Sequence, residues 1–64
     1  MEFIKEQRIN EFTFLVMYKQ EIDGITKFFT AFMKGEFLYL TICSLSLSAA
    51  SREFNKRLRE LQLL

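Results

Sequence analysis

The sequence predicts an all-α fold, a two-helix antiparallel hairpin, from three observations. The 64 residues contain no proline and only two glycines, so few positions interrupt regular structure. Hydrophobic residues recur at intervals of three and four along most of the chain. Gly35 follows the cation Lys34 where the first hydrophobic stripe ends, which is typical of a helix C-terminus. We therefore expect one domain over residues 1–64, with helices at about 2–33 and about 37–62.

The first predicted helix has one apolar stripe, and the polar residues between its members would face water. The stripe consists of Phe12, Leu15, Tyr18, Ile22, Ile25, Phe29 and Phe32. Gly24 falls inside this pattern and should cost about 1 kcal/mol relative to Ala. We interpret Gly24 as a bend or as a close approach of the second helix. Asn10 is a candidate N-cap if the first ten residues form a separate short helix.

The second predicted helix has a similar stripe, and one segment of it has a competing interpretation. The stripe consists of Leu40, Cys43, Leu47, Ala50, Phe54, Leu58 and Leu61. The segment 37–43 is rich in β-forming residues, and 44–48 alternates with period two, as a half-buried strand would. A single strand would have no partner in this hairpin, so we expect the segment to be helical.

A chain of this size leaves little net stability, and small domains usually depend on disulfides, a metal or self-association. Cys43 is the only cysteine and histidine is absent, so no intrachain disulfide and no Cys/His metal cluster can form. Its place in the stripe predicts that Cys43 is a buried small hydrophobe. Apolar residues off both stripes predict a second copy, giving a four-helix bundle, or a different protein partner.

The charge balance and the N-terminus exclude several classes of function. Nine basic and eight acidic residues give a net charge of +1, which creates no field that would select nucleic acid. The N-terminus lacks the apolar run and small-residue cleavage site of a secretory signal. The most apolar window, 37–50, is shorter than the roughly 20 residues that a spanning helix needs. We expect a cytoplasmic protein with no nucleic-acid or membrane partner and no cofactor of its own.

The C-terminal part of the chain carries a polar ridge. Ser51, Asn55, Arg59 and Gln62 follow one another by about one helical turn, flanked by Arg52, Lys56, Glu53 and Glu60. Such a ridge is usually only solvated. Its hydroxyl, amide and guanidinium groups also suit docking against a surface that carries carboxylates and a phosphate.

The ridge overlaps a run that resembles a family signature. Ser51-Arg52-Glu53-Phe54-Asn55 resembles the Ser-Gln-Glu-Leu-Asp signature of the sporulation-regulating aspartyl-phosphate phosphatases of stage-zero E type, which are small helical hairpins. The similarity extends back to Glu21-Ile22-Asp23 with Lys27 and forward through Lys56, Leu58, Glu60 and Gln62. Ser51 and Glu53 match the signature, whereas Arg52, Phe54 and Asn55 replace its Gln, Leu and Asp.

This resemblance implies a phosphatase that binds a phosphorylated response regulator of the sporulation phosphorelay and promotes hydrolysis of its acyl phosphate. The regulator would supply the metal ion and most of the electrostatics. The implied catalytic residues are Ser51, Arg52, Glu53 and Asn55, and the implied partner-binding residues are Lys56, Arg59 and Gln62. Of these, Asn55 can both donate to and accept from an attacking water, whereas Arg52 can only donate.

The alternative is a non-enzymatic helical adaptor. The chain is also similar to the small hairpin co-chaperones that keep type III secretion needle subunits soluble, on the residues Gly35, Tyr39, Leu47, Ala49 and Ala50. Its eight Phe residues favour this alternative, because a groove for a partner helix needs exposed apolar anchors.

Overall fold

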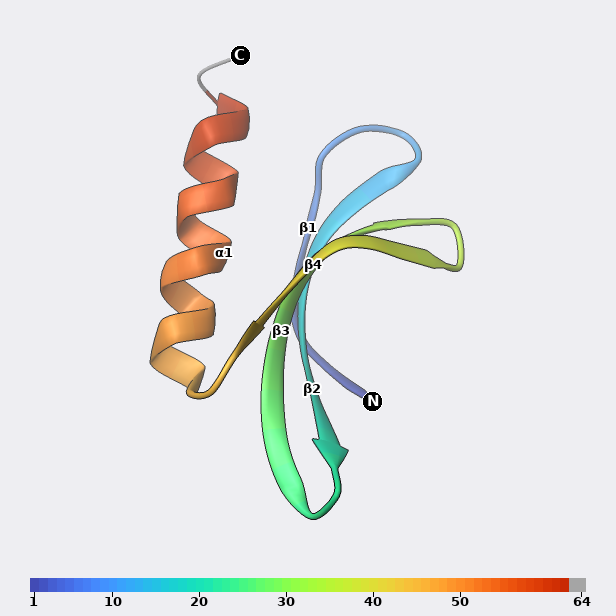
Figure 1. The fold of residues 1–64 in the computed structure, drawn as a ribbon. Helices are drawn as coiled ribbons and strands as arrows, with labels where there is room; N and C mark the ends of the chain where they lie inside the picture. Colours follow the sequence, from blue (N-terminus) through green and yellow to red (C-terminus); the bar gives the residue numbers. More distant parts are fainter. Residues whose placement is uncertain (63–64) are drawn as a thin grey trace.

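The computed structural model describes residues 1–62, apart from the side chain of Gln62, and its architecture is a β-sheet with one helix. The elements are β1 (Glu2–Arg8), β2 (Thr13–Ile22), β3 (Ile25–Lys34), β4 (Phe37–Ser44) and α1 (Leu47–Gln62). The strands form one antiparallel sheet in the order β1-β2-β3-β4, and α1 lies along one face of it (Figure 1). The predicted all-α helical hairpin is therefore wrong, since the region of the first helix forms three strands and 37–44 forms the fourth.

Two tight turns connect the long central strands to their neighbours. Asp23 and Gly24 join β2 to β3 and have φ angles of +53° and +78°. Positive φ at both central residues defines a type I′ hairpin turn, for which Asp-Gly is a preferred pair. Gly35 has a φ of +60° at the first central position between β3 and β4. The dipeptide that we assigned to the interior of a helix is thus the turn that sets the register of the β2–β3 hairpin.

The helical interpretation failed because β2 is buried on both of its faces. Leu15 and Met17 pack toward α1, while Val16 and Tyr18 pack on the opposite face. A strand buried on both sides loses the polar alternation that normally identifies it. A near-continuous apolar run then satisfies spacings of three and four as readily as a spacing of two. Its β-branched and aromatic residues fit a pleated surface better than a helix.

The core between the sheet and α1 holds the helix in place. It contains Leu15, Met17, Ala50 and Phe54, packed with the partly buried Ile9, Phe28, Phe32 and Leu58. The buried hydroxyl of Thr30 donates a hydrogen bond of 3.3 Å to the carbonyl oxygen of Ala50. The ammonium group of Lys5 lies 4.9 Å from the centre of the Phe54 ring. A cation over an aromatic face is attracted to it, so this contact ties β1 to the helix.

The opposite face of the sheet has a second, smaller core that no helix in the described part of the chain covers. Val16, Tyr18 and Ala31 are buried there among Phe14, Phe29, Met33 and Leu38. The Tyr18 ring stacks on Phe29 at 5.1 Å and meets Phe3 edge-on at 5.9 Å. Burial raises the pKa of the Tyr18 phenol, and Cys43 raises it further, while a hydrogen bond with Thr41 lowers it. Tyr18 therefore contacts both outer strands of the sheet.

The helix α1 begins at a side-chain cap. The hydroxyl of Ser46 accepts a hydrogen bond of 3.2 Å from the backbone N–H of Ala49. This is the N-cap arrangement that satisfies one of the free amides of the first turn. The alternating run 44–48 therefore contains the end of β4, a short connection and the start of α1.

The structure also corrects the prediction for Cys43, which is exposed on β4 and not buried in a core. Its strand partner is Phe29, which places it on the face opposite α1. Because β4 is an outer strand, a side chain there has strand neighbours on one side only. The four-helix dimer, which required a second long helix, is excluded with the hairpin.

Candidate partner-binding surface

The four predicted catalytic residues lie on α1, but they do not form one surface. Arg52 and Asn55 are exposed, whereas Ser51 and Glu53 are half-buried toward the sheet. The Glu53 carboxylate accepts a hydrogen bond of 3.4 Å from Nε of Arg57. Glu53 is therefore engaged within the helix and does not point outward with Asn55.

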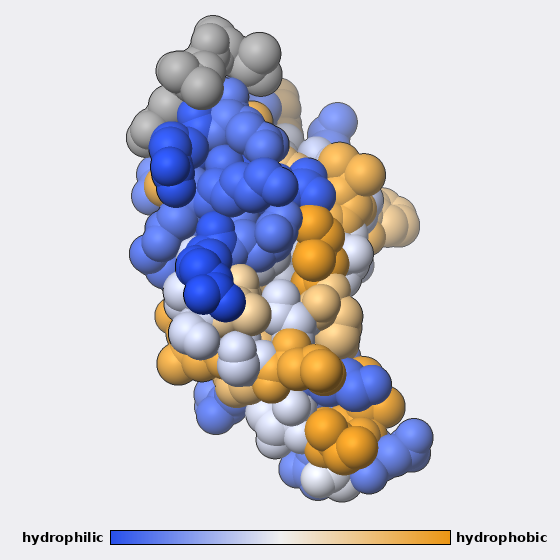
Figure 2. All heavy atoms as spheres, turned by 60° about the vertical axis from the view of Figure 1, so that its left-hand side comes forward, coloured by the Kyte–Doolittle hydropathy of each residue, from blue (hydrophilic) through white to orange (hydrophobic). Residues whose placement is uncertain are grey.

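The predicted partner-binding residues Lys56 and Arg59 are exposed on the same helix. Together with Arg52 and Asn55 they form the outer face of α1, which appears as a continuous hydrophilic area in Figure 2. The spacing of three and four residues puts their side chains beside one another. Gln62 ends the helix, and its side chain lies outside the described residues. The outer face is thus cationic with one amide, and it suits contact with an acidic surface.

No candidate metal centre is present in the described part of the chain. Among residues 1–62, no three His, Cys, Asp or Glu side chains gather as a group that could hold a metal ion. None of the helical structure in the same range combines the length and the apolarity that crossing a membrane requires.

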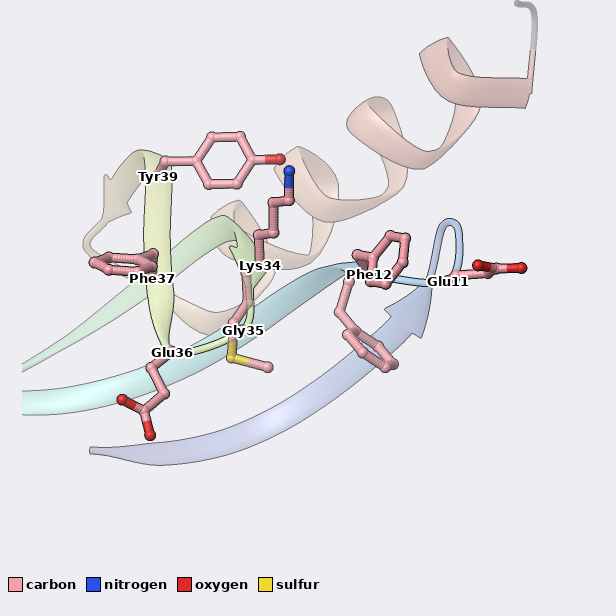
Figure 3. A pocket seen from close by; sticks show the side chains of 9 residues that line it. Glu11, Phe12, Lys34, Gly35, Glu36, Phe37 and Tyr39 are labelled. Atoms are coloured by element: carbon pink, nitrogen blue, oxygen red, sulfur yellow. The ribbon is translucent and has the colours of Figure 1, made fainter.

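A large hollow lies at one end of the sheet, between the tips of the β1–β2 and β3–β4 hairpins. We call it the hairpin-tip groove, and its volume is about 690 Å³. It is lined by Glu11, Phe12, Phe14, Met33, Lys34, Gly35, Glu36, Phe37 and Tyr39. Figure 3 shows Lys34 and Tyr39 coming from one hairpin and Phe12 and Glu11 from the other. Two segments that are distant in the sequence thus build one concave surface.

The lining of the groove is rich in aromatic side chains, which account for four of its nine residues. Phe12 is 67% exposed and Phe37 is 79% exposed, while Phe14 and Met33 form a half-buried part of the lining. Ligand-binding sites commonly have volumes of roughly 300–1,000 Å³ and predominantly apolar linings. Aromatic and Met side chains are also the types that are enriched in protein interfaces. The chemistry of the groove therefore fits an apolar segment of a partner.

Backbone geometry explains how Phe12 comes to lie there. The backbone N–H of Ile9 donates a hydrogen bond of 2.8 Å to the carbonyl oxygen of Thr13. The side-chain oxygen of Asn10 accepts one of 2.9 Å from the N–H of Phe12. Asn10, which we expected at a helix start, instead stabilises a tight turn that displays Phe12. Pairing of Thr13 with Lys34 then brings this turn beside the end of β3.

Exposed hydrophobic side chains continue from the groove along β4, whose outer side has no strand partner among the described residues. Phe37, Tyr39 and Leu40 are exposed on the strand, and Leu45 and Leu47 are exposed just after it. Leu40 has a φ of +52° at a bulge where Thr30 and Phe32 oppose Ile42 and Tyr39. Hydrophobic residues gathered beside and below the hydrophilic helix are visible in Figure 2.

Sequence reasoning missed both surfaces because it assigned these residues to two helices, some on the apolar stripes and others off them. The signal that could have found them was the combination of Asp23-Gly24 with apolar runs on either side. Comparisons with protein-family models, with curated proteins and with solved structures gave no match to this chain.

Proposed function

We propose that this chain is a non-enzymatic protein-binding module that takes an apolar segment of another protein into its hairpin-tip groove. The observation that carries the proposal is the aromatic lining of the groove, with Phe12 and Phe37 both more than half exposed. Burying a Phe side chain that is otherwise in water contributes about 1.5–3 kcal/mol. Two such anchors therefore contribute about 3–6 kcal/mol before the cost of association is subtracted, and the other apolar lining residues must contribute the rest.

The rim of the groove specifies the chemistry of the partner further. Lys34 lies among the lining residues together with Glu11 and Glu36, so charged groups of both signs border an apolar floor. A peptide with aromatic or long aliphatic anchors fits the floor, and polar or charged flanks can be paired at the rim. The proposal keeps the protein-binding role of the adaptor alternative. It differs in the scaffold, because the binding surface is built on a sheet and not on a helical hairpin.

The phosphatase activity is a separate prediction that the fold leaves untested. Its exposed residues, Arg52 and Asn55, sit on the outer face of α1, away from the groove. If this face acts on a phosphorylated response regulator, the wild type will accelerate release of phosphate from the regulator, and the Asn55→Ala variant will not. Equal rates with and without the wild-type protein would exclude the activity. A cytoplasmic location likewise stays a prediction.

Panning of a random peptide library on the purified protein tests the proposed function directly. We expect enrichment of peptides with aromatic or long aliphatic anchors. A synthetic copy of the most enriched peptide should then bind the wild type, and the Phe12→Ser variant should bind it at least tenfold more weakly. Phe12 is largely exposed, so its replacement should leave the fold intact, which circular dichroism can verify.

The matched control is Ile25→Ser, which removes a hydrophobic side chain that is 57% exposed at the opposite end of the sheet. This variant should bind the peptide as the wild type does. Equal weakening by both substitutions would show general stickiness of the exposed surface, and unchanged binding by Phe12→Ser would remove the groove as the site.

A further inference from the structure

We propose that β4 pairs with β4 of a second copy in antiparallel orientation, about a two-fold axis that passes through the bulge at Leu40 and Thr41. This pairing joins two four-stranded sheets into one continuous sheet. It uses the free backbone edge of β4, whereas the proposed function uses the hairpin-tip groove. Phe37 and Tyr39 belong to both surfaces, and the Phe12→Ser variant described below separates the two proposals. Four features of β4 support it: its charge, its alternation, its strain and its exposed apolar side chains.

The first feature is the absence of charge. Every residue of Phe37–Ser44 is uncharged, so no like-charged pair arises when the strand meets itself. Charged side chains on an outer strand are a common device that prevents such pairing, because an incoming strand would have to desolvate them. The nearest charged residue, Glu36, lies beyond the paired strand and would come near Leu45 of the second copy. Self-pairing of β4 is therefore electrostatically permitted over its whole length.

The second feature is the way the bulge changes the alternation of side chains. Residues 37 and 39 pair with Lys34 and Phe32, and residues 42 and 44 pair with Thr30 and Phe28. These β3 partners share one side of the sheet, so all four β4 residues point toward the α1 side. Leu38 and Cys43 pair with Met33 and Phe29 and point to the opposite side.

This alternation makes β4 complementary to itself in one register. Directly opposed residues of antiparallel strands point to the same side of a sheet. This condition is satisfied at every pair when Phe37, Leu38 and Tyr39 lie opposite positions 44, 43 and 42 of the second copy. The two bulges then face each other on the axis. The straight segment 37–39 of each copy pairs with the straight segment 42–44 of the other copy. Both α1 helices then lie on the same face of the joined sheet.

The third feature is the conformation of Leu40, whose φ of +52° is unusual for a residue with a branched side chain. The left-handed region costs roughly 1–2 kcal/mol for such residues. Leu40 is 63% exposed, so its side chain contributes little packing to a single copy. Pairing at the axis would bury this side chain.

The fourth feature is the apolar surface at the two ends of the strand. Phe37 at the start of β4 is 79% exposed, and Leu45 just after its end is 80% exposed. Two-fold antiparallel pairing brings the start of one copy beside the end of the other, so each end of the contact carries Phe37 of one copy and Leu45 of the other. A stable interface covers roughly 800 Å² on each partner and needs an apolar centre. Leu40 lies at that centre, beside the two-fold axis, and Phe37 and Leu45 extend the apolar surface to both ends.

A single substitution tests both the pairing and its register, because Cys43 is already present. In the Leu38→Cys variant, position 38 of one copy opposes Cys43 of the other, with Cα atoms about 4.5–5.5 Å apart. A disulfide fits this separation. Within one copy the two positions lie about 16 Å apart along the strand and cannot be bridged. Mild oxidation should therefore convert most of the variant to a covalent dimer whose only cross-link, by peptide mapping, joins 38 to 43.

Two single-cysteine proteins are the controls, namely the wild type and Leu38→Cys combined with Cys43→Ser. The proposed register keeps identical positions apart, so neither should form more than a trace of covalent dimer. Similar cross-linking of all three proteins would reflect random collisions and would overturn the proposal. So would light scattering that gives the wild type the mass of a single chain.

A second pair keeps the test valid if Leu38→Cys does not fold. Phe37→Cys with Ser44→Cys, in a Cys43→Ser background, places two cysteines opposite each other on the α1 side. Phe37 is largely exposed, so the substitution removes little packing. This variant should form a dimer linked through 37 and 44, and failure of both designs to cross-link would exclude the register. The Phe12→Ser variant should cross-link normally in either background, which separates this result from the groove.

Discussion

The two outer strands of the sheet have the same free backbone edge but different side chains. β1 carries Glu2, Lys5, Glu6 and Arg8 among its seven residues, whereas β4 has eight residues and no charge. Each strand also contains a bulge, at Ile4 in β1 and at Leu40 in β4. Both edges are therefore interrupted by a bulge, and they differ in the positive φ of Leu40 and in the side chains that they carry.

The charged side chains on β1 oppose pairing of that edge with another strand in two ways. They would have to lose water if another strand approached, and they are already engaged within the molecule. Lys5 covers the Phe54 ring, and the Glu2 carboxylate lies 3.1 Å from the Lys19 ammonium on β2. On β4, Tyr39 stacks on Phe32 at 5.6 Å, but among the described residues no ion pair or cation–π contact involves this strand. An edge is thus protected by the side chains it carries and by what they touch, and by this measure β4 is the open one.

The largest expected effect concerns the attachment of β1 to the helix. Phe54→Ala removes a ring that is 1% exposed and contacts both the core and Lys5, so it should cost about 3–5 kcal/mol of unfolding free energy. Phe37→Ala on β4 removes a ring of the same size that is 79% exposed, and it should change stability by no more than about 0.5 kcal/mol. Urea denaturation followed by circular dichroism measures both. Equal losses would mean that Phe37 is packed in the folded protein.

The next effect compares one added charge on each edge. Leu40→Lys places two ammonium groups near the proposed two-fold axis and should weaken self-association at least tenfold. Ile4→Lys adds the same charge at the bulge of β1 and should leave the association unchanged. Sedimentation or light scattering over a concentration series measures both. If the dimer persists in Leu40→Lys and is lost in Ile4→Lys, the contact is formed by β1 and the proposed β4 contact is wrong.

A smaller effect distinguishes the backbones of the two bulges. Leu40→Gly removes the positive-φ cost at a largely exposed position and should stabilise a single copy by about 1 kcal/mol. Ile4 has no positive φ, so Ile4→Gly should destabilise it by about 0.5–1 kcal/mol. Thermal unfolding at low protein concentration, where association does not contribute, compares the two variants. Destabilisation by Leu40→Gly would mean that the Leu40 side chain stabilises the folded protein by more than its positive φ costs.

The smallest effect concerns Tyr18, which touches Phe3 of β1 and Thr41 of β4. Burial raises the pKa of its phenol above the ordinary 10.0, so the folded state holds the proton more tightly than the unfolded state. This contribution is fully present below pH 10 and is lost as the pH rises through the folded-state pKa. Tyr18→Phe should therefore lose less stability above pH 10 than the wild type does. Urea denaturation at a series of pH values measures the free energy of unfolding of both proteins. An equal decrease in the two proteins above pH 10 would contradict the raised pKa of Tyr18.

Some parts of this architecture were readable from local chemistry. The helical spacing of Ala50, Phe54 and Leu58 places them on the side of α1 that meets the sheet. Gly35 has the positive φ that we expected of a glycine just after the first stripe, although it joins two strands and does not end a helix. Asp23-Gly24 was equally readable as a hairpin turn, and our interpretation overlooked it because the flanking residues also fitted a helix stripe.

The candidate surfaces were less accessible to prediction. Arg52 and Asn55 were expected on an exposed helix face and lie on one, but their neighbour Glu53 is paired with Arg57. The hairpin-tip groove requires Phe12 and Phe37 to line the same hollow, and that arrangement depends on the register of β2 with β3. Neither spacing nor composition carries this information.

Residue chemistry along the chain is sufficient for the short-range features: an amphipathic helix near the C-terminus, a Ser46 cap, two turns where glycine takes positive φ, and an uncharged apolar segment before the helix. Strand pairing is different, because the backbone bonds of a strand are completed by residues that are distant in sequence. An apolar run such as Leu15–Tyr18 satisfies either period until its partners are known. Only the assembled sheet therefore decided which residues were buried on both faces, which met at the groove, and which outer strand was left open.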